Sequence, residues 1–338
     1  MTVRSSAMGW LLSAAALGAG SPASHAEGGV PEKVVLAIGL KTGKPVSYVD
    51  QTVTRTTVIL SKDLKELGVV APRSEEQSVT EFSLEALEPA PKGGTRARLR
   101  FGRLTWKESG GRSLSSEERL SGDLLQLMQD TQRVALGGTE FTVTLDAGGV
   151  VRTVEGCEAA VKARRKSLGL DDTSTLLLSL AIDPDLVGDI VNAMLVAPPL
   201  PAGEVFVGRK WDDDDAARGV ISFQLSLLRR TFRVTGIGPS EVKIEGKGSL
   251  VHRTRNVPRS MPDTMSSVSP KKSAATSVLR VSRDDGLPIE AKTTASASYR
   301  DKLLEMDSEW SQESRLQRVD RWPSAPAAPA PGDASPGK

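Results

Sequence analysis

Three arginines occupy every second position of one predicted strand, and they are the residues best placed to bind a charged partner. The arginines are Arg96, Arg98 and Arg100, and the residues that follow each of them are Ala97, Leu99 and Phe101. Alternate side chains of a strand point to the same face, so the three guanidiniums are expected to lie together. Guanidiniums bind carboxylates and phosphates through paired hydrogen bonds, so the row predicts a ligand-binding surface for an anionic lipid headgroup or polysaccharide. A row of extended, solvent-exposed arginines is the alternative interpretation.

A second candidate ligand-binding surface is apolar. Apolar and polar residues alternate around Ile221, Phe223 and Leu225, which predicts a strand with these three residues on one face. Residues 175–182 and 186–196 are predicted helices that carry apolar residues around most of their circumference. A strongly curved sheet would lose contact with straight helices along part of its width. The aliphatic groove between them would suit an acyl chain. If the two layers met completely, the same residues would form an ordinary core.

The residues that common enzymatic chemistries need are mostly missing. Residues 39–45 look like a phosphate-binding loop, but three residues rather than four separate the glycines, and a proline replaces the magnesium-binding hydroxyl. His252 is the only histidine and Cys157 the only cysteine after residue 26, so neither a histidine-based zinc site nor a Cys/His nucleophile pair is expected. We therefore predict a protein that is not an enzyme, without catalytic residues, metal or cofactor. Carboxylates that meet only in the fold would be the remaining route to hydrolysis.

Two smaller features each allow two interpretations. Residues 212–215 are four consecutive aspartates, which could ligate Ca²⁺ or form a solvated turn; the absence of glycine-punctuated spacing favours the turn. Cys157 begins a predicted helix, where its thiol pKa could be lowered, although a small half-buried residue is the simpler interpretation.

The N-terminus has the three features of a secretory signal peptide. Arg4 supplies a positive charge, residues 8–20 are small and apolar, and residues 24–26 (Ser-His-Ala) form a cleavage site. We predict that residues 1–26 are removed and that a mature protein starting at Glu27 is exported to the periplasm or the exterior of a bacterium. No cysteine lies near Ala26, so no lipid anchor is expected, and no other apolar run is long enough for a transmembrane segment. The net charge of +2, with basic residues spread along the chain, argues against a nucleic-acid partner.

Alternating strands dominate the rest of the chain and predict a mainly β fold of the α+β class. Two hairpins with Asp/Gly turns, at residues 140–155 and 278–294, organise this prediction, with the other strands on one side of them. The expected architecture is a curved antiparallel sheet with a helical insert packed on one face. Residues 299–319 fit either a helix or a long closing strand.

Composition divides the chain into segments. We predict a first β-rich half at residues 27–156, the helical insert at 157–202, a second β-rich half at 203–320, and a disordered Pro/Ala-rich tail at 321–338. Each half opens with a strand and a Gly-basic turn and ends on an Asp/Gly hairpin, which indicates either an internal duplication or merely a shared use of strands and turns. A Pro/Ser-rich excursion at residues 256–273 is predicted to be a mobile loop.

Several short motifs follow one another in a recognisable order. They are the turn at residues 41–45, the run LGGTEFTVTLDAGGV at 136–150, the sequence PPLP at 198–201 and the sequence VGRKW at 207–211. This order resembles a bacterial family of exported, lipoprotein-like domains of unknown function, over residues 34–298. The chain differs from that family in lacking a lipid-anchor cysteine and in its excursion at 256–273, and the resemblance implies no catalytic residues. The strand order is also similar, at the level of fold, to periplasmic lipoprotein carriers, whose curved sheets cradle acyl chains against helices.

These features predict a non-enzymatic protein of the cell envelope that binds a lipid or other apolar ligand in a groove between sheet and helices. The alternative is a structural or protein-interaction scaffold of the envelope, with the sheet as its docking surface. An open apolar cleft on the concave face would favour the carrier, and a sealed core would favour the scaffold. The sequence does not indicate an oligomeric state.

Overall fold

The computed structural model describes residues 32–60, 66, 70–90, 94–195, 200–201, 203–212, 226–252, 268–301 and 306–323. The predicted signal peptide and most of the predicted tail lie outside these residues. The strand segment that carries Ile221, Phe223 and Leu225 lies outside them as well, so its predicted ligand-binding role stays a prediction.

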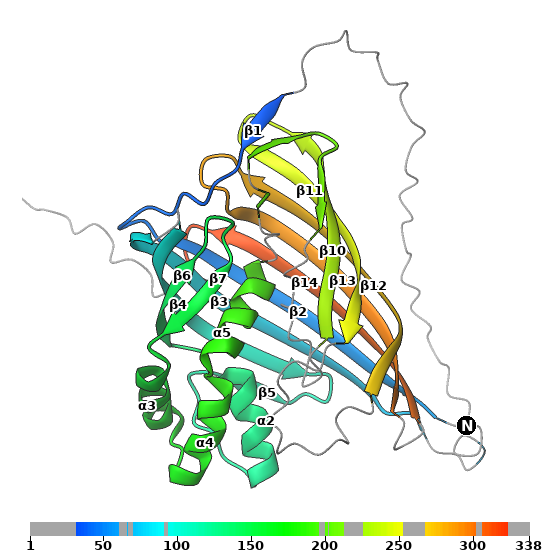
Figure 1. The fold of residues 1–338 in the computed structure, drawn as a ribbon. Helices are drawn as coiled ribbons and strands as arrows, with labels where there is room; N and C mark the ends of the chain where they lie inside the picture. The colour runs from blue at the N-terminus through cyan, green and yellow to red at the C-terminus, as the bar shows by residue number, and fades with distance from the viewer. Residues whose placement is uncertain are drawn as a thin grey trace, which may run out of the picture. The chain divides into compact units, whose positions relative to one another are not determined.

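An antiparallel sheet of twelve strands forms most of the described fold (Figure 1). Its strands are β2 (Val46–Ile59), β3 (Arg73–Ala90), β4 (Gly94–Glu108), β5 (Ser113–Ser115), β6 (Glu140–Leu145), β7 (Val151–Glu155), β9 (Lys210–Asp212), β10 (Ser226–Ile237), β11 (Glu241–His252), β12 (Val268–Ser282), β13 (Pro288–Asp301) and β14 (Met306–Val319). From edge to edge the order is β7-β6-β4-β3-β2-β14-β13-β12-β11-β10-β9, and β5 pairs with β4 beside this path. A second, two-stranded sheet pairs β1 (Lys33–Val35) with β8 (Glu204–Phe206).

The two predicted hairpins occupy different places in the sheet. Residues 140–155 form β6 and β7 at one edge, so the other strands lie on one side of this hairpin, as predicted. Residues 278–294 belong to β12 and β13, which lie inside the sheet between β11 and β14. The prediction that strands lie on one side of the second hairpin is therefore wrong, because both of its outer edges are paired. The mainly β, antiparallel fold itself is confirmed.

Four described helices precede and follow the β6–β7 hairpin. They are α2 (Leu124–Val134), α3 (Cys157–Leu168), α4 (Asp172–Ala181) and α5 (Pro184–Leu195). Asp123 caps α2, because its Oδ1 accepts the backbone N–H of Gln126 at 2.9 Å. Gly169 ends α3 in the left-handed conformation, and Pro184 occupies the first turn of α5. The predicted helical insert is thus confirmed as α3 to α5, and α5 packs on β7.

Strand alternation gives the sheet two chemically different faces. We call the face of Ala97, Leu99 and Phe101 the core face, because these side chains are at most 3% exposed. The strand register carries this face from β4 across the sheet through Leu84, Tyr48, Leu316, Leu279, Ile244 and Val234. We call the opposite face, which holds the arginine row of β4, the outer face. The helices α2 to α5 and the core face share one continuous cluster of buried residues.

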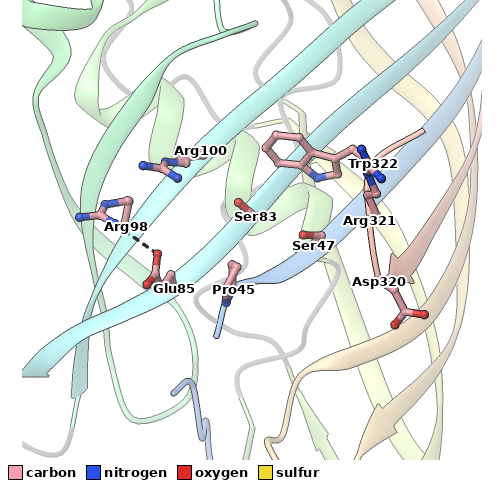
Figure 2. Close-up of a pocket in the computed structure, with 9 residues that line it drawn as sticks. All are labelled: Pro45, Ser47, Ser83, Glu85, Arg98, Arg100, Asp320, Arg321 and Trp322. Carbon is pink, nitrogen blue, oxygen red and sulfur yellow. Dashed lines mark hydrogen bonds and ion pairs between the residues drawn. The ribbon is translucent and has the colours of Figure 1, made fainter. Parts of the chain in front are cut away.

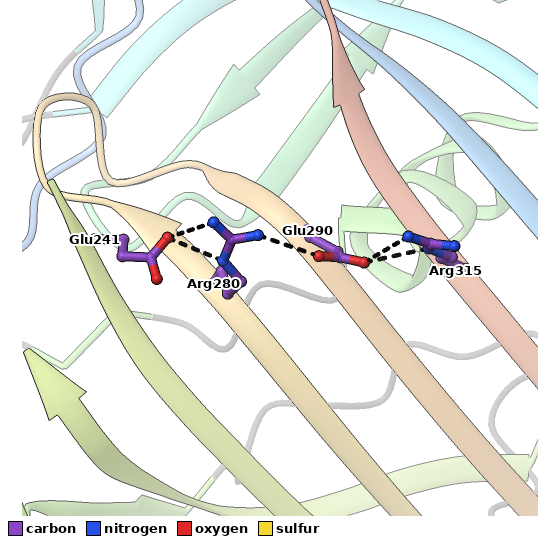
Figure 3. Close-up of polar contacts among 4 residues, drawn as sticks. All are labelled: Glu241, Arg280, Glu290 and Arg315. Carbon is purple, nitrogen blue, oxygen red and sulfur yellow. Dashed lines mark hydrogen bonds and ion pairs between the residues drawn. The ribbon is translucent and has the colours of Figure 1, made fainter. Parts of the chain in front are cut away.

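The outer face is crossed by a ladder of ion pairs (Figure 3). Glu241 on β11 pairs with Arg280 on β12 at 2.7 Å, and Glu290 on β13 pairs with Arg280 at 3.3 Å and with Arg315 on β14 at 2.9 Å. Exposed ion pairs stabilise a fold by about 0–1 kcal/mol each, so the ladder mainly favours this register over a shifted one.

One end of the core face is closed by the chain that follows β1. The N–H of Gly39 donates to the carbonyl of Asp285 at 2.9 Å, beside the β12–β13 turn. A Cβ on Gly149, in the β6–β7 turn, would lie 2.8 Å from the Cδ1 of Ile38. Both organising turns therefore contact the segment of residues 36–40. Gly286 has a φ of +63°, and a Cβ there would approach the carbonyl oxygen of Ala37 to 2.4 Å, so this contact requires glycine.

Two predicted elements take their final form in the second half. Residues 299–319 are not a helix: they hold the end of β13 and the closing strand β14, with the large side chains of Trp310 and Leu316 on the core face. The excursion at 256–273 is shorter than predicted, because β12 begins at Val268; residues 256–267 lie outside the described part of the chain.

Candidate functional site

The predicted arginine row lies on the outer face of β4, on the opposite side of the sheet from Ala97, Leu99 and Phe101. Its ion pairs are Arg96 with Glu88 (2.8 Å) and Glu155 (2.7 Å), Arg98 with Glu85 (3.2 Å) and Glu140 (3.3 Å), and Arg100 with Glu140 (2.5 Å). Each guanidinium thus has an acidic partner on its own or a neighbouring strand. The row cannot hold the headgroup of a ligand whose chain lies on the core face.

Two arginines of the row line a pocket on the outer face (Figure 2). Its volume is about 240 Å³, and it is lined by Pro45, Ser47, Ser83, Glu85, Arg98, Arg100, Asp320, Arg321 and Trp322. Arg98 and Arg100 lie at one side, and the residues that follow β14 lie at the other, with Ser47 and Ser83 between them. The pocket therefore brings β2, β3 and β4 together with the chain that follows β14.

Trp322 lines this pocket and packs on the sheet. Its indole N–H donates to the carbonyl of Phe82 at 3.2 Å, which holds the ring across β3. A Cβ on Gly102 would lie 2.9 Å from the ring, so the glycine lets the indole lie against β4. Ser83 is buried although it lies on the outer face. The predicted disordered tail began at residue 321, and the structure shows that packed chain extends through Trp322.

Truncation can test this packing of Trp322. Ending the chain after Arg321 is expected to lower the free energy of unfolding by about 1–2 kcal/mol, because an indole that packs on the sheet and one hydrogen bond are lost. The melting temperature should fall by a few degrees. Ending it after Pro323 should leave the melting temperature unchanged. Equal melting temperatures for the two truncations would show that Trp322 does not pack.

The predicted groove against residues 221–225 stays a prediction, because that strand segment lies outside the described residues. Among the described elements, α5 packs on β7, and Leu178 of α4 and Val187 and Val191 of α5 are fully buried. This part of the helical layer forms an ordinary core. On the far side of α4, Leu176 and Leu180 are 65% and 62% exposed.

Beyond this core, a band of hydroxyl side chains crosses the core face. Register places Ser78, Thr52, Ser314, Thr293 and Ser277 side by side on five consecutive strands, β3, β2, β14, β13 and β12. Buried charged groups adjoin it: Asp50 accepts from Thr52 at 3.0 Å and from Ser314 at 2.9 Å, and Arg230 donates to Ser277 at 3.2 Å. Burial raises the pKa of the Asp50 carboxyl to about 6, and the two hydroxyl bonds act in the opposite direction.

A second apolar cluster lies on the core face on the other side of the hydroxyl band. It consists of Ala275, Ala295, Ala297, Tyr299 and Trp310, which contact one another and are separate from the main core. Three alanines on two neighbouring strands make a low floor beside two aromatic rings. Trp310 is 7% exposed, and its indole N–H has no hydrogen-bond partner among the residues that the structure describes. A buried donor without an acceptor is costly in a folded protein, so this N–H indicates a missing partner.

The structure also places Cys157 and Asp212, two residues of the smaller predicted features. Burial, and after it Asp183, raises the pKa of the Cys157 thiol, the opposite of an activated nucleophile. Asp212 ends β9 and accepts from the hydroxyl of Thr231 at 2.6 Å, and residues 213–215 lie outside the described chain. The described part of the chain shows no group of three His, Cys, Asp or Glu side chains arranged to hold a metal. None of its helices is both long and apolar enough to cross a membrane.

Sequence reasoning missed both tryptophans of these two sites. Trp310 falls on the alternation Trp310, Gln312, Ser314, Leu316, which a strand prediction would place on one face. Because residues 299–319 fitted either a helix or a strand, this alternation was not used to place Trp310. Trp322 was assigned to the tail because prolines and alanines dominate the residues after it.

Comparison with known proteins gives weak structural likenesses and no family. No family model matches the sequence, and no curated protein matches it. Lipovitellin, in a structure that concerns its lipid–protein interactions, is 12% identical with a TM-score of 0.47; the match covers 86% of this chain and 26% of lipovitellin. DynF from the dynemicin biosynthesis pathway of Micromonospora chersina is 9% identical with a TM-score of 0.21, covering 88% of this chain and 92% of DynF. The chain thus spans about a quarter of the length of lipovitellin.

Proposed function

We propose that this protein is a non-enzymatic lipid-binding protein of the bacterial cell envelope, and that the second apolar cluster holds the lipid. The observation that carries the proposal is the buried indole N–H of Trp310, which has no acceptor within the described part of the chain and clusters with three alanines. The predicted signal peptide supports the envelope location. The scarcity of histidine and cysteine supports a binding role without catalysis.

The arrangement of side chains suits an amphiphile with an uncharged polar end. Ala275, Ala295 and Ala297 are 3–7% exposed, so an acyl chain that lies on them takes the place of the groups that cover them. A carbonyl or ester oxygen of the same molecule can accept the indole N–H of Trp310. The hydroxyl band adjoins the cluster and offers Thr52 and Ser314 to further polar atoms of the ligand. The apolar floor and the polar band thus correspond to the two ends of such a molecule.

Substituting Trp310 with phenylalanine separates ligand binding from folding. The variant keeps an aromatic ring and removes the unpaired N–H, so its melting temperature should be unchanged or slightly higher. Its affinity for a pyrene-labelled monoacylglycerol, followed by pyrene fluorescence, should fall several-fold because one hydrogen bond of about 1 kcal/mol is lost. A residue that only packs would lower stability and leave the affinity unchanged.

The matched control lies on the same sheet and the opposite face. Val278 of β12 is 55% exposed on the outer face, so Val278→Leu should change neither stability nor affinity. Filling the floor with Ala297→Leu should block the probe, and native mass spectrometry of detergent-free protein should show bound lipid in the wild type. If a folded wild type binds neither lipid nor probe, the proposal fails.

The second candidate function is an envelope scaffold. It is favoured by the buried residues of α4 and α5, which belong to the same ordinary core as the core face of the described strands. A folded protein without lipid affinity would support this reading.

A further inference from the structure

The outer face carries its charges differently on its two sides. Each guanidinium of the arginine row on β4 has an acidic partner. On the outer face of β9 to β13, in contrast, six exposed basic side chains form no ion pair within the described part of the chain. We call them the basic patch: Lys210, Arg229, Arg233, Lys243, Lys247 and Lys292.

The carboxylates described on this part of the outer face do not neutralise the basic patch. Glu241 and Glu290 are engaged by Arg280, at 2.7 and 3.3 Å, in the ladder that Figure 3 shows. Asp212 and Glu245 remain, so two carboxylates face six cations. The patch therefore keeps an excess of positive charge, which attracts anions.

The strand register brings like charges together at this patch. Arg233 of β10 lies directly opposite Lys210 of β9, and Lys243 of β11 lies directly opposite Arg280 of β12. Like charges that face each other on neighbouring strands destabilise a sheet. An anionic partner bound over the patch would relieve this repulsion, so the arrangement suits a bound state better than a free one.

Hydroxyl side chains lie among the cations. The register row of Lys247 continues through Thr276 and Thr294, whose hydroxyl oxygens are 2.7 Å apart. These hydroxyls can donate to and accept from the hydroxyls of a sugar.

The patch lacks the groups that other anionic partners use. The described outer-face residues of β9 to β13 include no aromatic side chain, and Val278 is the one large apolar side chain exposed among them. Single-stranded nucleic acids are held by stacking on aromatic rings, and membrane surfaces are held by inserted apolar groups. Cations interspersed with hydroxyls correspond better to a polymer that carries both anionic groups and hydroxyls.

We propose that the basic patch binds an acidic polysaccharide, an extended chain of sugars that carries carboxylate or phosphate groups. Neighbouring strands lie about 4.8 Å apart, so the patch extends roughly 19 Å across its five strands, which suits a polymer better than a single small anion. The cations hold the anionic groups, and Thr276 and Thr294 bond to sugar hydroxyls. The patch is on the face opposite the second apolar cluster, so it is independent of the lipid site proposed above.

Affinity electrophoresis of the protein, in gels that contain polygalacturonate, tests this proposal. The wild type should be retarded by polygalacturonate and not by neutral dextran, and the retardation should weaken as salt screens the charges. The variant K243Q/K247Q should lower the affinity at least about tenfold, because two charged hydrogen-bond donors are lost, without lowering the melting temperature. The variant T276V/T294V keeps the net charge and should lower the affinity several-fold, because only bonds to sugar hydroxyls are lost.

The matched control is R96Q/R100Q, which removes the same number of positive charges from the neutralised arginine row of β4. It should change the affinity by less than about twofold, because its charges already have partners. Phosphatidylglycerol vesicles and single-stranded DNA test the other anionic partners. The proposal is overturned if the control weakens binding as much as K243Q/K247Q, if T276V/T294V leaves the affinity unchanged, or if vesicles or DNA bind more tightly than polygalacturonate.

Discussion

Replacing Arg164 with methionine is expected to lower the free energy of unfolding by about 3–5 kcal/mol. This arginine of α3 is 5% exposed, and burial lowers its pKa to about 10. Its guanidinium donates to the carbonyls of Ala135 (3.0 Å), Val134 (3.1 Å) and Ser116 (3.1 Å). Methionine would keep the apolar stem and leave three buried carbonyls without that donor.

The position of these carbonyls explains why the loss should be large. Val134 is the last residue of α2 and Ala135 is its C-cap, so the guanidinium binds carbonyls that the helix itself cannot satisfy. A cation at a helix C-terminus is also favoured by the helix dipole. The third carbonyl belongs to Ser116, which follows β5, so one side chain ties α3 to α2 and to the sheet.

Urea denaturation measures the effect, with two comparison variants. Arg164→Lys should fall between wild type and Arg164→Met, because an ammonium cannot reproduce the planar fork of donors. Lys162→Met, at an exposed position of the same helix, should change stability by less than about 0.5 kcal/mol. If Arg164→Met changed the free energy of unfolding as little as Lys162→Met, the guanidinium would not link α3 to α2 and the sheet as the geometry indicates.

The secondary structure of this chain was largely readable from local patterns. The alternation of Phe141, Val143 and Leu145 predicts the strand β6. The backbone preferences of Gly169 and Pro184 predict the end of α3 and the start of α5. The pairing of β2 with β14 could not be predicted, because it joins residues 248 to 272 positions apart, from Asp307↔Ile59 (307 − 59) to Val319↔Ser47 (319 − 47), and depends on register alone. The residues of a strand do not indicate which other strand will pair with it. The position of β12 and β13 inside the sheet was missed for the same reason.

The sites were predicted less well than the fold. The arginine row was found because alternation is a local property, and its face was correctly opposed to that of Ala97 and Leu99. Its pocket depends on Trp322, which lies more than 200 residues later in the chain. Arg164 could have been noticed, since it falls between Ala160 and Leu168 on the buried stripe of α3. Asp50 likewise continues the buried positions of Val46 and Tyr48 on β2.

Asp50 should make the free energy of unfolding depend on pH, through the pairing of β2 in the first half of the chain with β14 in the second. It lies on β2 opposite Leu316 of β14, is 7% exposed, and accepts from the hydroxyls of Thr52 and Ser314. Burial raises its pKa from 3.8 to about 6. The folded state therefore holds the proton more tightly than the unfolded state. The stabilisation by the neutral carboxyl is complete below pH 4 and is lost as pH rises to about 6, an effect of up to about 3 kcal/mol.

Asp50→Asn should remove this pH dependence, because the amide resembles the protonated acid and does not ionise. At pH 7 to 8 the variant is expected to be more stable than wild type by about 1–3 kcal/mol, and near pH 4 the two should be equal or the wild type slightly more stable. Urea denaturation at several pH values between 4 and 8 measures the difference. The control is Glu309→Gln, an exposed carboxylate on β14 that should leave the profile of the wild type intact. A difference between Asp50→Asn and wild type that stays constant from pH 4 to 8 would mean that Asp50 is already ionised throughout, and that the hydroxyls of Thr52 and Ser314 outweigh its burial.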